Sequence, residues 1–434
     1  MRDLLSSRLI ALLVAIVLTW GLALNTGQPL IFNMAYLLSA VLIISYVWAL
    51  FSVRTVEISR FTRARRSQVG QTSDEIFEIN NQSRLPKLWL ELEDYSDLPF
   101  HECSQVVSGL RPRNRRRWQV RTQNQVRGRF RLGPMVLRSG DPLGLFVVEH
   151  QIPATSSMVV YPATVELPAF RPPVADLSGG EALSRRSHYV TTNVSSVREY
   201  APGDSFNRIH WRTTARTGRL MTKEFELDPT ADIWIFLDLF EGSEVKLPWR
   251  LNPPQDGIWA LTAGRRRELP LPPISTEYVV AAAASIARHF LVRNRAVGLV
   301  SRGQTREIMQ TDRGERQLSK ILETLAVVQA EGQVPFAQLI ATEAIRLSRN
   351  DTILAISADP DPGWVRALRE MRRRGVHSMA VVVNGRSFTP GRSYLPVFDE
   401  LEATGIPRYV VHRGQAMDDA LSRQATAADL AGVA

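Results

Sequence analysis

The chain has 434 residues, of which 44% are hydrophobic and 22% are charged, and its formal net charge is +10. This length allows two or three domains with a substantial core. The single cysteine, Cys103, excludes an internal disulfide and a zinc site built on several cysteines. We expect Cys103 to be a packed or partly exposed thiol and not a nucleophile. The basic excess suits anionic lipid or nucleic acid as a partner, but membrane-anchored proteins also carry one to fix their orientation.

Two apolar blocks open the chain, at residues 9–24 and about 30–51, separated by the polar break NTGQP. Since about 20 apolar residues span a bilayer, residues 1–54 are predicted to form a transmembrane hairpin. Arginines flank both ends of the hairpin and none lies in the break. Both termini and the soluble domains are therefore expected on the cytoplasmic side of the cell (inner or plasma) membrane. A cleaved signal peptide at the first block is the alternative, and it leaves the remaining chain on the same side.

Residues 55–165 alternate polar and apolar side chains in short runs such as DEIFEIN and LWLELEDY, with turn residues between them. At least six such strands predict a small antiparallel β-sandwich beside the membrane. Its segment RPRNRRRW, from Arg111 to Trp118, is a basic patch. The patch is either a hairpin turn with solvated or lipid-bound arginines, or a nucleic-acid site in which Trp118 stacks on a base. We favour the former, because no nucleic-acid recognition motif accompanies the patch.

Residues 166–230 hold a Pro-, Gly- and Ser-rich linker followed by a polar motif. Residues 231–424 then alternate buried strands with helices of 10 to 15 residues, which predicts a doubly wound α/β domain with a parallel sheet. A Pro-rich insertion at 240–274 interrupts this pattern, and the sequence does not say whether the insertion is ordered. Small residues at 425–434 predict a disordered tail.

The motif VREYAPGDSFNRIHWRTTARTGRLMTKEFE lies between the linker and the α/β domain. Asp204 or Ser205 is placed to cap a helix that begins at about Phe206 and ends at Gly218. In such a helix Arg208, Arg212 and Arg216 share one face, while Ile209 and Trp211 face the core. The segment LMTKEFEL after Gly218 alternates as a strand.

This motif resembles the signature of a bacterial family called domain of unknown function 58. The residues that carry the resemblance are Arg198, Glu199, Tyr200, Gly203, Asp204, Arg208, Ile209, Trp211, Ala215 and Arg216. The resemblance implies a von Willebrand A-like domain after the membrane hairpin and β module, and action with a MoxR-type AAA+ ATPase in protein assembly or maturation. Its charged residues form either an internal salt-bridge network, which we favour, or a partner-binding surface. Either alternative predicts that Asp204→Ala or Arg208→Ala is damaging.

Von Willebrand A domains often bind Mg²⁺ through a DxSxS turn, a Thr and a further Asp. Here Asp238 is followed by Phe240 and Gly242 at the two Ser positions, and Val334 stands near the Thr position. Asp359 is the candidate for the further Asp. With two of five ligands left, Asp238 and Asp359 form a degenerate site, and we expect no metal and no cofactor.

Three classes of function remain open. The motifs of P-loop enzymes, serine hydrolases and zinc proteases are absent, no Cys–His pair has a suitable spacing, and the seven histidines, His210 and His377 among them, are scattered. We therefore expect no enzyme. The leading hypothesis is a membrane-anchored cytosolic adaptor or scaffold that binds a MoxR-type ATPase or its clients. The alternative is a protein that binds anionic lipid, or less plausibly nucleic acid, through the basic patch. Oligomeric state and the identity of the partner are left undetermined.

Overall fold

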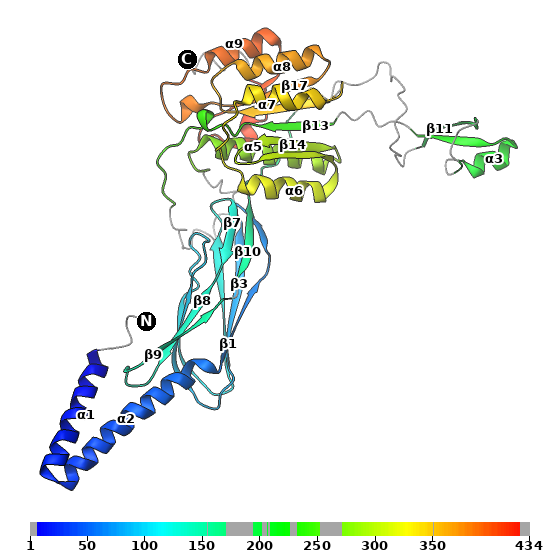
Figure 1. The fold of residues 1–434 in the computed structure, drawn as a ribbon. Coiled ribbons are helices and arrows are strands. Elements are labelled where there is room, and N and C mark those ends of the chain that lie inside the picture. The colour runs from blue at the N-terminus through cyan, green and yellow to red at the C-terminus, as the bar shows by residue number, and fades with distance from the viewer. Residues whose placement is uncertain are drawn as a thin grey trace. The chain divides into compact units, whose positions relative to one another are not determined.

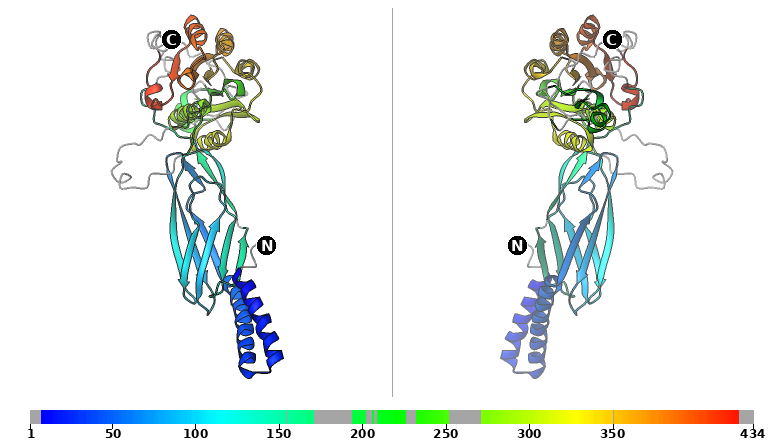
Figure 2. Two further views of the ribbon diagram at one scale, coloured as in Figure 1. Left: turned by 90° about the vertical axis from the view of Figure 1, so that its left-hand side faces the viewer. Right: turned by 90° about the vertical axis from the view of Figure 1, so that its right-hand side faces the viewer.

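The computed structural model describes residues 7–153, 155–170, 194–201, 206, 209–225, 232–251, 271–349 and 351–425. They form two compact units (Figures 1 and 2). The first consists of Met1–Thr164, Pro248–Pro272 and Leu322–Val328; the second consists of Val165–Leu247, Pro273–Ile321 and Gln329–Ala434. Most of the predicted linker, the middle of the insertion and the predicted tail lie outside the described residues.

Two apolar helices begin the first unit, as predicted, but each is a few residues longer than its apolar block. Helix α1 spans Ser7–Thr26 and helix α2 spans Pro29–Arg54. Both are long and apolar enough to cross a membrane. They pack on each other through small buried residues, including Ala23 and Ala35. Trp20 adds a hydrogen bond from its indole N–H to Ser39 Oγ (3.2 Å) across the pair.

The last turn of α2 is part of the β-sheet core that follows it. Val53 is buried in one cluster with Ile79, Leu90 and Leu137. The buried amine of Lys87 donates hydrogen bonds to the Phe51 carbonyl (2.6 Å) and to Thr55 Oγ1 (2.9 Å). Lys87 thereby satisfies one of the carbonyls that a helix leaves free at its C-terminus, where the helix dipole favours a cation. Burial lowers the pKa of Lys87.

Ten strands form three sheets in this unit. They are β1 (Val56–Thr62), β2 (Arg66–Gln68), β3 (Thr72–Asn81), β4 (Lys87–Asp94), β5 (Gln105–Leu110), β6 (Arg115–Gln123), β7 (Gly128–Leu132), β8 (Met135–Gly140), β9 (Val147–Ile152) and β10 (Ser156–Tyr161). Their orders are β1-β3-β6, β5-β4-β8-β9 and β2-β10-β7.

The expectation of antiparallel sheets is confirmed for most of these strands. One pairing is different, because the three-residue strand β2 runs parallel to β10. Alternate residues of β3 and β4, such as Phe77 and Leu92, point into shared apolar clusters. Period-two alternation in the sequence therefore identified the buried face of each long strand.

The second unit contains a six-stranded sheet of order β15-β14-β13-β16-β17-β18. Its strands are β13 (Ile233–Leu237), β14 (Val297–Arg302), β15 (Arg306–Asp312), β16 (Thr352–Ser357), β17 (His377–Val383) and β18 (Arg408–Val411). The sheet is mixed and mostly parallel. The sequence predicted a parallel sheet, whereas the edge strand β15 returns antiparallel to β14. This edge is exposed on one side, so β15 lacks the continuous apolar run of the buried strands.

Helices cover both faces of this sheet (Figure 1). They are α5 (Ser275–Val292), α6 (Gly314–Val327), α7 (Phe336–Glu343), α8 (Gly363–Arg373), α9 (Leu395–Thr404) and the short α10 (Met417–Ala420). Helices α7, α8 and α9 share a core with Phe236 of β13, through side chains such as Trp364 and Phe398. Helix α5 packs on β13, β14, β16 and β17 and is buried along nearly its whole length.

Replacing Lys87 with Met should lower the thermal stability of the first unit. The substitution keeps most of the apolar stem but leaves the Phe51 carbonyl buried without its donor, which costs about 1–3 kcal/mol. Thermal unfolding of the detergent-solubilised protein measures the effect, with the exposed Lys320→Met as the matched control. Equal melting temperatures for the two variants would contradict the capping role of Lys87.

Candidate functional site

The polar motif forms a small unit of two strands and a helix, here called the signature unit. Strand β11 (Val194–Glu199) pairs antiparallel with β12 (Met221–Phe225), so the strand predicted after Gly218 is confirmed. The backbone of His210 then donates to the Met221 carbonyl (2.8 Å), which attaches the intervening segment to β12. Gly203, Asp204 and Arg208 lie outside the described residues.

Helix α3 spans Trp211–Thr217, so the helix begins about five residues later than predicted. The cap is His210, whose ring nitrogen Nδ1 accepts the backbone N–H of Thr213 (3.3 Å) and lies 2.6 Å from its hydroxyl. His210 therefore lies at the helix start and not inside the helix. Gly218 ends the helix as predicted, with a φ of 69° that favours glycine. Of the predicted arginine face, Arg212 and Arg216 lie in α3, and Arg208 lies outside the described residues.

The exposed side chains of α3 are the main feature of the signature unit. None of the seven residues described in this helix is buried. Trp211 is 66% exposed, which corrects the prediction that it faces the core, whereas Ile209 is buried as predicted. Arg212, Ala215 and Arg216 are exposed. Near them, Phe206 is 69% exposed, and its ring lies tilted by 35° to that of Tyr200, with centroids 5.9 Å apart.

Charged residues that the structure describes in the signature unit interact at its surface. Glu199 pairs with Arg219 (2.8 Å), and both side chains are largely exposed. Arg198 donates a hydrogen bond to the carbonyl of Glu199 (3.0 Å). Surface pairs of this kind contribute little to stability. The described residues of the motif therefore form an exposed surface, as a partner-binding surface would, more than a buried salt-bridge network.

Asp238 and Asp359 lie at the carboxyl edge of the mixed sheet. Asp238, directly after β13, is buried and accepts hydrogen bonds from Ser357 Oγ (2.6 Å) and from the backbone N–H of Phe240 (3.0 Å). Burial raises the pKa of Asp238 to about 6, although these hydrogen bonds act in the opposite direction. Burial also raises the pKa of Asp359. The two acids are close enough for the charge of Asp359 to raise the pKa of Asp238 further.

The same edge carries a guanidinium. Arg392 donates hydrogen bonds to the carbonyls of Gly242 (3.2 Å) and Ser243 (3.4 Å). Its positive charge partly offsets the effect of burial on the pKa of Asp359, which stays raised. A side chain at position 242 would meet the ring of Phe240, because a Cβ there would lie 2.4 Å from that ring. Phe240 therefore leaves no room for a serine at position 242. The hydrogen bonds of Asp238 and of the Arg392 guanidinium therefore hold the loops at this edge.

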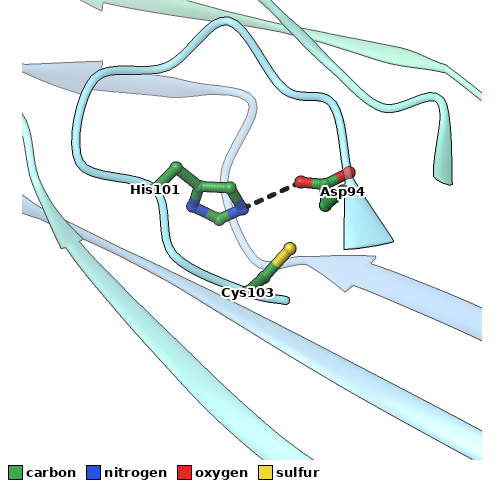
Figure 3. A group of neighbouring side chains, drawn as sticks. All are labelled: Asp94, His101 and Cys103. Atoms are coloured by element: carbon green, nitrogen blue, oxygen red, sulfur yellow. Dashed lines mark ion pairs between the residues drawn. The ribbon is translucent and has the colours of Figure 1, made fainter. Parts of the chain in front are cut away.

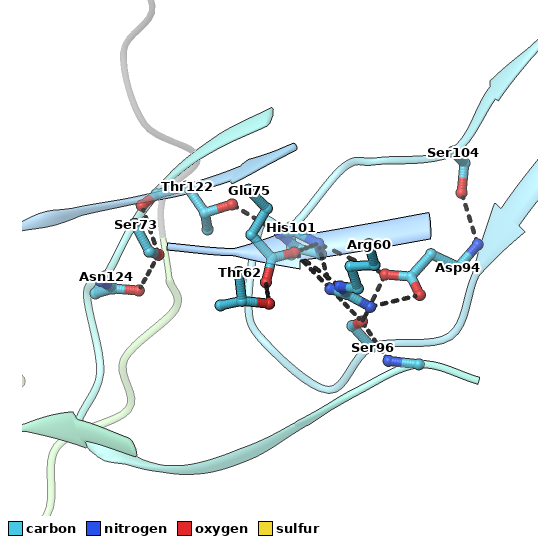
Figure 4. Close-up of polar contacts among 11 residues, drawn as sticks. Arg60, Thr62, Ser73, Glu75, Asp94, Ser96, His101, Ser104, Thr122 and Asn124 are labelled. Carbon is cyan, nitrogen blue, oxygen red and sulfur yellow. Dashed lines mark hydrogen bonds and ion pairs between the residues drawn. The ribbon is translucent and has the colours of Figure 1, made fainter. Parts of the chain in front are cut away.

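A buried polar cluster in the first unit joins strands that are distant in sequence (Figure 4). Arg60 of β1 pairs with Glu75 of β3 (2.6 Å) and with Asp94 of β4 (3.2 Å). Its guanidinium also lies over the ring of Phe77, 5.1 Å from the centroid. Burial by itself raises the pKa of Glu75, but hydrogen bonds from His101 and Arg60 more than offset it and hold that pKa below its ordinary value.

Cys103 lies beside this cluster, which the sequence did not predict. Among the described residues, Asp94, His101 and Cys103 are the one group of three potential metal ligands, with ligand atoms within 4.8 Å of one another (Figure 3). Cys103 is buried, and burial together with a hydrogen bond to Asp94 raises the pKa of its thiol. The expectation that no Cys–His pair has a suitable spacing is therefore wrong. The signal was the HEC spacing, since residues i and i+2 of an extended segment point to one side.

Comparison with known proteins agrees with the motif. The family described as "Protein of unknown function DUF58" matches residues 196–246, which include most of the signature unit and the start of the α/β domain. Residues 196–246 of this chain are therefore a DUF58 segment. It is similar to the "Uncharacterized protein YeaD" of Bacillus subtilis (strain 168), with 25% identity over 218 residues. That match covers 50% of this chain and 47% of YeaD, so it spans about half the length of the curated relative.

Two of the similar solved structures each cover about a quarter of this chain. A CARDB domain from Pyrococcus furiosus has 13% identity over 24% of this chain and 86% of its own, with a TM-score of 0.19. A complex of Zinc 2-glycoprotein and Prolactin inducible protein from human seminal plasma has 10% identity, 25% and 97% coverage, and a TM-score of 0.20. These likenesses are too slight to support any inference on the function of this chain.

The raised pKa of Asp238 predicts a pH-dependent stability of the α/β domain. Because the folded protein retains this proton up to about pH 6, and an unfolded aspartate loses it near pH 4, the free energy of unfolding decreases as pH rises between these values. Asp238→Asn should remove this pH-dependent decrease in the free energy of unfolding, which is on the order of 2–3 kcal/mol. Its melting temperature relative to the unsubstituted protein should therefore increase from pH 4 to pH 6 and then level off.

The exposed Asp399→Asn on α9 is the control for that pH series. Asp351, whose pKa burial also raises to about 6, should respond to Asp351→Asn in the same direction as Asp238. A melting-temperature difference for Asp238→Asn that stays constant from pH 4 to pH 8 would contradict the assignment.

Proposed function

We propose that this protein is a membrane-anchored adaptor that binds a partner protein through the signature unit and catalyses no reaction. The observation that supports the proposal is helix α3, which buries none of its described residues and exposes Trp211 beside Arg212 and Arg216. A tryptophan that is 66% exposed on a short helix contributes little burial energy to the fold. Tryptophan and arginine are the residues that most often dominate the binding energy of protein interfaces.

The charges of the signature unit indicate the chemistry of the partner. Arg212 and Arg216 lie one helical turn apart, and Arg219 follows the helix and pairs with Glu199. A surface of this kind is complementary to a partner that offers an apolar pocket for Trp211 and acidic side chains around it. Such charges mainly govern the rate of association and its dependence on salt.

The topology proposed for this adaptor is a two-pass hairpin in the cell membrane with both termini and the soluble domains in the cytoplasm. The soluble part would then be a β-sandwich and a von Willebrand A-like domain. The family resemblance points to a MoxR-type AAA+ ATPase, or one of its clients, as the partner. The carboxyl edge supports binding without a metal, because Asp238 is engaged by Ser357 and a loop amide, and Arg392 binds the loop that would supply further ligands.

A second candidate function is contact with anionic lipid through the basic patch. The turn between β5 and β6 carries Arg111 and Arg113, and Leu110 pairs with Lys87, the residue that caps α2. The patch therefore lies at the end of the β unit from which α2 leaves. Trp118 stacks on Phe77 (centroids 5.5 Å apart, planes at 16°). This packing engages the ring that a nucleic-acid site would need for base stacking, so lipid headgroups are the favoured anion.

Trp211→Ala should weaken binding of the purified MoxR-type ATPase by about 30-fold, the effect of losing about 2 kcal/mol at a central aromatic contact. Arg212→Glu with Arg216→Glu should weaken it further and reduce its dependence on salt. The measurement is surface-based binding of the ATPase to full-length protein in nanodiscs of zwitterionic lipid, with the exposed Arg423→Glu as the matched control.

Unchanged affinity in both signature variants would contradict the proposal. Trp249→Ala then tests the described arm of the insertion, where Trp249 is 38% exposed. Binding that depends only on anionic lipid in the nanodisc, and that Arg115→Glu with Arg116→Glu abolishes, would favour the second candidate function instead.

A further inference from the structure

The turn between β8 and β9 has an apolar tip and is held in shape by a buried carboxylate. Asp141 is buried and accepts hydrogen bonds from the backbone N–H groups of Leu143 (2.9 Å) and Phe146 (2.6 Å). Leu143 and Val147 are nevertheless exposed, and no charged residue lies between Asp141 and Glu149. Exposed apolar side chains that are grouped on a fixed turn indicate a contact surface.

The same turn contacts both apolar helices of the first unit. The rings of Phe146 and of Tyr46 on α2 have centroids 5.4 Å apart. A Cβ at Gly144 would lie 3.0 Å from Nη1 of Arg8 on α1, so this guanidinium lies against the backbone of the turn. Helix α2 also packs on β8 and β9, and Val53 in its last turn enters the core of the β unit (Figure 1). These contacts fix the position of the turn along the helices.

The position of Arg8 gives the depth of the turn in a bilayer. Residues 9–53 hold no charged side chain, so Arg8 and Arg54 bound the apolar hairpin. From Arg8 to Thr26, the last residue of α1, the helix rises about 27 Å, close to the ~30 Å thickness of the hydrocarbon layer. If the connection at Gly27 lies at one face of the bilayer, the guanidinium of Arg8 lies among the headgroups of the other. The turn that it contacts lies at the same depth.

We propose that the tip of the β8–β9 turn inserts into the membrane, at the boundary between the lipid headgroups and the acyl chains. This inference rests on the membrane topology proposed above. Leu143 and Val147 enter the apolar side of the boundary, and Phe146 with Tyr46 forms an aromatic pair at the depth where such rings are enriched. Lipid is the favoured occupant because a soluble protein would have to enter the headgroup layer to reach this turn.

Insertion gives the β unit a second attachment to the bilayer, besides the end of α2. A transmembrane helix can tilt in the bilayer, and a unit fixed to that helix alone tilts with it. The β8–β9 turn restricts this motion, because tilting would pull Leu143 and Val147 out of the boundary into water. The β unit therefore keeps one orientation at the membrane surface.

A nitroxide spin label at Leu143→Cys, in full-length protein in nanodiscs of zwitterionic lipid, tests the inference. Oxygen concentrates in the bilayer and a nickel chelate stays in water, so collisions with each report the depth of the label. We expect the ratio of oxygen to nickel accessibility to be several-fold higher at 143 than at the matched control Phe61→Cys. The two side chains are 53% and 54% exposed, and Phe61 lies about 17 Å along β1 from Val56.

Val17→Cys, in the middle of α1, reports separately on the membrane topology. A label at 17 should exclude nickel most strongly, and the unsubstituted protein, whose one thiol is buried, should take up no label. Equal ratios at 143 and 61, with a label at 17 that excludes nickel, would overturn the insertion and leave the hairpin in place. Exclusion of both reagents at 143 would also overturn it, since protein would then cover the turn. Free access of nickel to position 17 would overturn the membrane topology itself.

Discussion

The last turn of helix α2 belongs both to the apolar hairpin and to the core of the β unit. Val53 is buried among strand residues, and Lys87 of β4 donates to the carbonyl of Phe51. Between Arg54 and Val56 there is room for one residue only, so no linker separates the helix from the first strand. A β unit attached in this way follows the orientation of its anchor, and this constraint bears on every proposal for what the protein contacts at a membrane.

The sequence predicted two candidate sites, the carboxyl edge of the mixed sheet and the signature unit, and their polar groups have different surroundings. At the carboxyl edge of the mixed sheet, Ser357 donates a hydrogen bond to Asp238, and Arg392 donates to the carbonyls of the adjoining loop. In the signature unit, Trp211 and its neighbouring arginines are exposed and contribute little to the fold. Protein folds rarely retain an exposed aromatic and basic surface for stability, which is why the signature unit is the better candidate for recognition.

Sequence patterns predicted the long elements because burial imposes a regular spacing of apolar residues on helices and strands. Helix α5 and the strands β13, β16 and β17 are buried along their length, and their apolar runs predicted them. Strands β2, β5, β9 and β15 were missed, because β2 is three residues long and the other three bury few or none of their side chains. The start of α3 was misplaced because histidine is an uncommon cap. The cluster around Arg60 joins β1, β3 and β4, and no local pattern reports contacts at that separation.

The central claim is that the exposed face of α3 contacts a partner protein. A photo-crosslinking amino acid at position 211 of the full-length protein, activated in native membranes, tests this most directly, with exposed position 292 on α5 as the reference. The account predicts a MoxR-type AAA+ ATPase or one of its clients as the main adduct at 211 and not at 292. Adducts to lipid alone, or the same adducts at both positions, would contradict it.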